Sequence, residues 1–98
     1  MKFVITVSDK AMQMLQKLER DRSLAKRFRA VQKALTYLRD NPQHPSLYTH
    51  KFSAFVGKNG EEMFEAYAEN HTPGAYRVFW HYGPGKGEIT IFDITPHP

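Results

Sequence analysis

The stretch that decides the fold is Ala75-Tyr-Arg-Val-Phe-Trp-His-Tyr-Gly-Pro-Gly-Lys-Gly-Glu-Ile-Thr-Ile-Phe-Asp-Ile-Thr-Pro-His-Pro98. Two runs in it, 76–82 and 88–95, have the composition and alternation of strands and flank a glycine-rich turn. We expect them to pair as a hairpin, which brings Arg77 on the first strand close to His97 after the second. A guanidinium beside an imidazole suits chemistry on a phosphate better than it suits a protein core.

The first 40 residues predict a strand followed by two helices. Residues 2–7 alternate between apolar and other side chains, as a strand does. Apolar residues then recur at helical spacing over 11–18 and over 24–38, with Asp21-Arg-Ser23 between them. Two amphipathic helices joined by so short a connection form an antiparallel hairpin. The second helix should end before Pro42, because proline disfavours helical geometry in the preceding residue.

The rest of the chain predicts a small sheet. Residues 41–62 contain two prolines and an Asn-Gly pair and are expected to be irregular, whereas 63–69 alternate again as a strand. This strand and those at 76–82 and 88–95 make a three-stranded antiparallel meander. The predicted fold class is therefore α+β, a single domain over 1–98. We expect its N-terminal strand inside the sheet, the helical hairpin on one face and a concave basic surface on the other.

The composition excludes several classes of protein. Hydrophobic residues make up 41% of the chain and aromatic residues 13%, which is typical of a folded globule and not of a disordered segment. No apolar run approaches the roughly 18 residues of a membrane span. The chain has no cysteine, and its histidines lack the spacing of a zinc site. We therefore expect no metal, no cofactor and no membrane association, and a cytoplasmic location.

Positive charge is concentrated in the first half of the chain. The net charge of +4 is the sum of +7 over residues 1–51 (eleven Lys and Arg, four Asp and Glu) and −3 over residues 52–98 (three against six). A basic cluster on the predicted helices attracts a polyanion such as RNA or DNA, or an acidic protein. The simpler interpretation of any one of these residues is a solvated helical face.

The order of elements resembles the RelE/ParE superfamily of type II toxin–antitoxin toxins, in particular its RelE-like branch of mRNA interferases and plasmid-stabilisation toxins. The motif that carries the resemblance is Tyr76-Arg-Val-Phe-Trp80 on the penultimate strand, followed by Ile89–Thr95 on the last. Leu47-x-x-His50-Lys51-Phe52-Ser53 is similar to the family's segment before its second strand. The resemblance covers nearly the whole chain and implies a RelE-like microbial ribonuclease fold.

The resemblance also implies a function. It is that of a metal-independent endoribonuclease that cleaves mRNA on the ribosome, inhibits translation and is neutralised by a cognate acidic antitoxin. Three alternatives belong to other classes. One is a ParE-like poison of DNA gyrase without nuclease activity, and another is a degenerate relative that binds only an antitoxin or nucleic acid. The third is an unrelated RNA-binding domain that uses its basic helices.

Three residues are candidates for catalysis. Metal-free RNA cleavage needs a base for the 2′-hydroxyl, a cation for the phosphorane and an acid for the leaving oxygen. The family's strand arginine corresponds to Arg77, and its acid–base residue at the end of the last strand corresponds to His97. RelE has two lysines on its second sheet strand, where this chain has Glu65 and Tyr67. Carboxylates act as bases in other branches, so the resemblance makes Glu65 a third candidate.

Four further residues are candidates for RNA binding. His50 and Lys51, before the sheet, could clamp the RNA backbone, and His81 shares a strand face with Arg77. Tyr67 could stack on a base. Simpler interpretations compete with these catalytic and RNA-binding roles. Arg77 could form an ion pair with a glutamate on the neighbouring strand, and His97 could belong to a frayed terminus. Tyr67 could pack against aromatic rings of the neighbouring strands.

Overall fold

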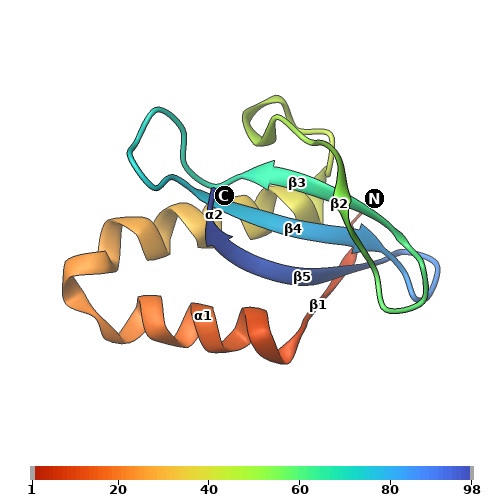
Figure 1. The fold of residues 1–98 in the computed structure, drawn as a ribbon, viewed down its shortest axis with the longest axis horizontal. Coiled ribbons are helices and arrows are strands. Elements are labelled where there is room, and N and C mark those ends of the chain that lie inside the picture. The colour runs from red at the N-terminus through yellow and green to blue at the C-terminus, as the bar shows by residue number, and fades with distance from the viewer. Residues whose placement is uncertain (1, 98) are drawn as a thin grey trace.

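The chain forms one five-stranded sheet covered on one face by two helices (Figure 1). The computed structural model describes residues 2–97. Its elements, in chain order, are β1 (Val4–Val7), α1 (Asp9–Arg20), the 3-10 helix η1 (Arg22–Leu24), α2 (Ala25–Asp40), the 3-10 helix η2 (Pro45–Leu47), β2 (His50–Val56), β3 (Glu62–Tyr67), β4 (Tyr76–Tyr82) and β5 (Glu88–Pro96).

The strand order is β1-β5-β4-β3-β2, so the predicted position of the first strand inside the sheet is wrong. β2 to β5 pair consecutively and antiparallel, whereas β1 pairs with β5 alone, in parallel, and lies at the edge. The reason is topological. Consecutive hairpins occupy both sides of β3 and β4, so a strand from the other end of the chain can join only at the outer side of β5 or of β2, and β1 pairs with β5.

The meander has four strands, not the predicted three, because residues 41–62 are not irregular throughout. They contain η2 and the whole of β2. Lys51 pairs with Phe64 and Val56 with Glu62, so residues 52–55 stand opposite Met63 alone. Such a bulge interrupts the alternation of side chains, and the sequence of β2 therefore lacks the period of two by which a strand is recognised.

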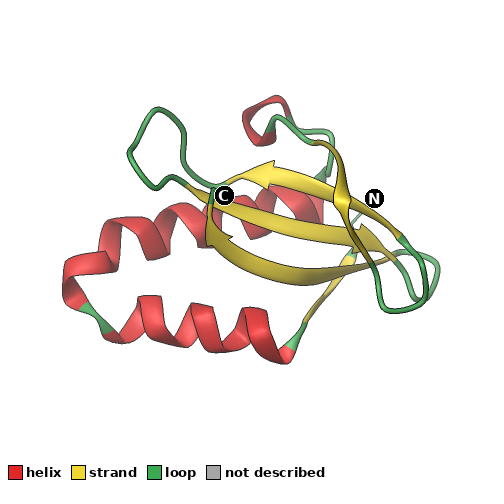
Figure 2. Cartoon of the chain, in the orientation of Figure 1, coloured by secondary structure: helices red, strands yellow, loops and turns green. Residues whose placement is uncertain are grey.

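The predicted helical hairpin is confirmed, and its two helices lie side by side (Figure 2). Their apolar stripes form the core against the sheet, with Leu18, Val31 and Leu38 fully buried together with Val78 and Trp80. Burying an aliphatic side chain of this size contributes about 1.5–3 kcal/mol. Among the helices of residues 2–97, none is both long enough and apolar enough to cross a membrane.

The other face of the sheet, which we call the open face, differs from the basic surface predicted for it. β2 crosses in front of β3 and β4 (Figure 1) and brings Phe55 within 5.1 Å of Phe79 on β4 and 5.8 Å of Phe92 on β5, between ring centroids. One end of the open face is therefore an aromatic cluster. The charged side chains gather at the other end.

Candidate active site

A buried carboxylate lies at the polar end of the open face. Glu65, in the middle of β3, is 2% exposed. Its Oε1 lies 2.6 Å from Nε2 of His50, and its Oε2 lies 3.3 Å from Nδ1 of His97 and 3.8 Å from Nε of Arg77. Because strand pairing fixes this geometry, one carboxylate joins side chains from β2, β4 and the end of β5. We call these four residues the Glu65 cluster.

The hydrogen bonds of His50 require a proton between this residue and Glu65. The Nδ1 of His50 lies 2.8 Å from the carbonyl oxygen of Tyr48, and a carbonyl can only accept, so Nδ1 carries a hydrogen. Nε2 is 2.6 Å from a carboxylate oxygen, which also only accepts unless it is protonated. The contact therefore holds one further proton, either on the imidazole or on the carboxyl group.

His97 is held at one nitrogen and exposed at the other. The 3.3 Å contact to Glu65 makes Nδ1 the donor, which leaves Nε2 as the acceptor in the neutral ring. Its side chain is 51% exposed. The backbone N–H of His97 donates to the carbonyl of Ala75 at 2.8 Å, so this end of the chain is tied to the sheet and is not frayed.

Arg77 is one of the two buried members of the Glu65 cluster, and its side chain is only 8% exposed. Its Nη1 donates to the carbonyl of Glu69 at 2.6 Å, and its guanidinium carbon lies 3.6 Å from the centroid of the Tyr67 ring. Its buried Nε has no hydrogen-bond partner within residues 2–97. The ion pair with Glu65 that the simpler interpretation expected is present. The guanidinium of Arg77 and the proton shared by His50 and Glu65 add two positive charges, and the carboxylate adds one negative charge. With His97 neutral, the Glu65 cluster carries a net charge of about +1, which suits a phosphate.

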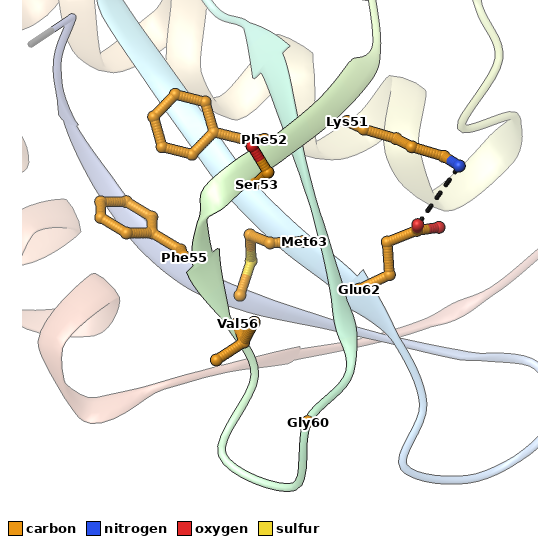
Figure 3. A pocket seen from close by; sticks show the side chains of 8 residues that line it. All are labelled: Lys51, Phe52, Ser53, Phe55, Val56, Gly60, Glu62 and Met63. Carbon is orange, nitrogen blue, oxygen red and sulfur yellow. Dashed lines mark ion pairs between the residues drawn. The ribbon is translucent and has the colours of Figure 1, made fainter.

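Lys51 does not join the cluster. It neighbours His50 on β2 and points the opposite way, forming an ion pair with Glu62 at 3.3 Å (Figure 3). Lys51 and Glu62 line a cavity of about 280 Å³ between β2 and β3, and the walls of this cavity are largely apolar. Successive side chains on a strand face opposite ways, so the structure separates Lys51 from His50, and the RNA-binding role of Lys51 stays a prediction.

His81 is also separated from the cluster. It shares the open face with Arg77, but Phe79 lies between them on β4 and the imidazole is buried, with Nδ1 2.8 Å from the carbonyl of Tyr82. The charge of His81 makes a minor contribution to lowering the pKa of Glu61, which is lowered mainly by backbone N–H groups of the β2–β3 turn. His81 is therefore buried apart from the Glu65 cluster, and its role in RNA binding stays a prediction.

Two features of the site were not predicted. Asp93 of β5 is buried and pairs with Lys10 of α1 at 3.1 Å. Tyr48 belongs to the surroundings of the site, since its carbonyl holds His50 and its exposed ring lies 5.2 Å from that of Tyr67. In the sequence, the only indication that Tyr48 lies at the site is its position two residues before His50.

The fold, but not the sequence, is similar to that of a known protein. No protein-family model and no curated protein matches the sequence. Among solved structures, the crystal structure of the archaeal RelE–RelB complex from Pyrococcus horikoshii OT3 is similar, with a TM-score of 0.66 and 16% identity over 98% of this chain and 96% of that chain. At this identity the likeness concerns the fold. The protein therefore has a RelE-like fold, as the order of its elements predicted.

Proposed function

We propose that this chain is the toxin of a type II toxin–antitoxin module and acts as an endoribonuclease on ribosome-bound mRNA in the cytoplasm. The observation that carries the proposal is the Glu65 cluster: a buried carboxylate with an arginine and two half-exposed histidines, on the open face of a RelE-like fold. The similar solved structure is a complex of RelE with RelB, which supports an antitoxin as the partner of this chain.

In this mechanism His97 is the base. Its exposed Nε2 takes the proton of a ribose 2′-hydroxyl, whose oxygen attacks the adjacent phosphorus. Glu65 accepts from Nδ1–H, fixes the tautomer and stabilises the imidazolium that forms, as the carboxylate of a catalytic triad does. Glu65 itself is buried with both oxygens engaged, so it is a positioning residue and not the direct base that the resemblance implied.

The same step breaks the bond from phosphorus to the 5′-oxygen. The proton held between His50 and Glu65 is the one available to that oxygen, once the half-exposed imidazole of His50 turns toward it. The net positive charge of the cluster offsets the charge that builds up on the phosphorane. The products are a 2′,3′-cyclic phosphate and a 5′-hydroxyl, with every proton accounted for.

The test is expression of this chain alone, followed by mapping of mRNA ends. We expect growth arrest and new 5′-hydroxyl ends within translated regions. His97→Gln should lower cleavage by about 100- to 10,000-fold, the usual contribution of a general acid or base. His71→Gln is the matched control, since His71 is exposed in the β3–β4 turn and forms no ion pair with the Glu65 cluster. Equal cleavage by both variants, or none by the parent chain, would contradict the proposal.

The near-complete burial of Arg77 favours a second candidate function. An arginine that binds a carbonyl and an aromatic ring has few donors left for a phosphate. If its role is structural, the same fold could act by binding, as a gyrase poison does. A supercoiling assay with purified gyrase separates the two functions, because the nuclease proposed above leaves supercoiling unchanged.

A further inference from the structure

Tyr48 occupies a backbone conformation that suits glycine better than tyrosine. It follows η2 with φ 48° and ψ 39°, in the left-handed region that is unfavourable for a bulky residue. Its side chain is 58% exposed, so core packing does not compensate for the strain. A strained residue that contributes little to the core is a candidate for a functional role.

The ring of Tyr48 extends the Glu65 cluster outward. Its centroid lies 5.2 Å from that of Tyr67, with the two rings inclined at 40°. The guanidinium of Arg77 covers one face of Tyr67, which leaves only the other face for the base-stacking role predicted for it. The exposed ring at this edge of the cluster is that of Tyr48.

The surroundings of this ring favour a nucleotide over an apolar peptide. Lys33, Tyr37 and Ser46 line a small hollow of about 110 Å³ together with Tyr67, the neighbour of Tyr48. An ammonium group and hydroxyl groups suit a backbone phosphate. Within residues 2–97, Lys33 forms no ion pair that would compete for this role.

We propose that Tyr48 is a stacking platform for one nucleobase of single-stranded RNA, immediately beside the scissile phosphate. The proposal rests on the proposed function, because it names the part of the substrate that this edge of the site binds. Stacking on an aromatic ring tolerates any base, and the backbone of Tyr48 anchors His50 at the same time. Tyr48 thus links base binding to the geometry of the cluster.

The experiment is an NMR titration of the whole chain with a ten-nucleotide single-stranded RNA whose riboses are 2′-O-methylated. Methylation removes the attacking hydroxyl, so binding is measured whether or not the protein is a nuclease. We expect upfield ring-current shifts of the Tyr48 ring signals. Tyr48→Gly should raise the dissociation constant roughly 5- to 150-fold, the loss of one base–aromatic stack, and Tyr48→Phe should restore binding.

His71→Gly is the matched control. His71 also has a positive φ, 58°, and is exposed, so glycine relieves the same kind of strain at a residue that forms no ion pair with the Glu65 cluster. This variant should bind RNA as the parent does. Glycine at position 48 keeps the carbonyl that holds His50, so the fold and the cluster should persist, which thermal unfolding checks. Unchanged affinity in Tyr48→Gly, or absence of shifts at the Tyr48 ring, would overturn the platform even if mRNA cleavage is observed.

Discussion

The two ends of the open face are built from the same strands and serve different purposes. At one end, Glu65 and Arg77 lie between two half-exposed histidines. At the other end, Phe79 is fully buried beneath Phe55 of β2. The difference arises in β2, which follows the edge of the sheet at His50 and then bulges across the open face. One irregular strand therefore decides where solvent reaches the sheet.

The two ends also differ in how they are stabilised. The aromatic end gains free energy by removing rings from water, and edge-to-face pairs add about 0.5–1.5 kcal/mol each. The polar end buries a carboxylate, which costs several kcal/mol that its three partners must offset. We infer that the aromatic end holds the sheet together and that the polar end is maintained for its chemistry.

The largest effect should come from the aromatic end. Phe79→Ala removes a fully buried ring at the centre of the cluster and should lower the free energy of unfolding by about 3–5 kcal/mol. Urea denaturation measures this loss. Phe55→Ala, at a half-buried position of the same cluster, is the control and should cost less. If the two variants lose equal stability, Phe55 of β2 supplies as much of the packing as Phe79 of β4, and the contrast between the two ends is wrong.

The next effect concerns the polar end. Arg77→Lys keeps the charge but loses the planar fork, so cleavage should fall by roughly 100- to 1000-fold, the effect of removing one oriented donor. Because Arg77 also donates to the Glu69 carbonyl, we expect a modest loss of stability besides. Arg29→Lys, on the exposed face of α2, is the control. Full cleavage by a folded Arg77→Lys protein would make the arginine structural and favour the gyrase-directed function.

Most of the polar end could be predicted from the sequence, whereas the path of β2 across the open face could not. Alternation and hairpin pairing suffice to bring Arg77 and His97 together and to put Glu65 on the same face. The position of His50 depends on where β2 bulges, which is a matter of three-dimensional packing and leaves no periodic signal. Alternation also puts His81 on the face of Arg77, but alternation gives no measure of burial, and the imidazole is buried.

A smaller effect is expected away from both ends, on the basic helices. Lys26 and Arg29 are exposed, whereas Arg27 bonds Glu69 at 2.8 Å and lies over the ring of Tyr76. Replacing Lys26 and Arg29 by alanine should slow association with an acidic antitoxin by up to about tenfold and flatten its salt dependence. Stopped-flow mixing at two ionic strengths measures both. Unchanged association would mean that these helices are simply solvated and that the partner binds elsewhere.

The smallest effect belongs to Asp21, which caps η1 between the two helices. Its carboxylate accepts from the hydroxyl of Ser23 at 2.6 Å and from its N–H at 3.0 Å. These bonds, the hydroxyl first, lower the pKa of Asp21 in the folded state. A lowered folded-state pKa means that the cap stabilises the fold above the unfolded-state pKa, roughly 3.9, and that this contribution is lost as the pH falls through the folded-state value.

Asp21→Ala should therefore lower Tm slightly at pH 7, and the difference from the parent should shrink as the pH is taken below about 4. The effect is small because the carboxylate is exposed to solvent. Differential scanning calorimetry across this range measures it, with RNA cleavage at pH 7 as the second readout. Cleavage should be unchanged, since the carboxylate of Asp21 bonds only Ser23 within residues 2–97 and contacts no residue of the Glu65 cluster. A Tm difference that persists at low pH would show that packing of the connection, and not the charge of the cap, orders the turn between the helices.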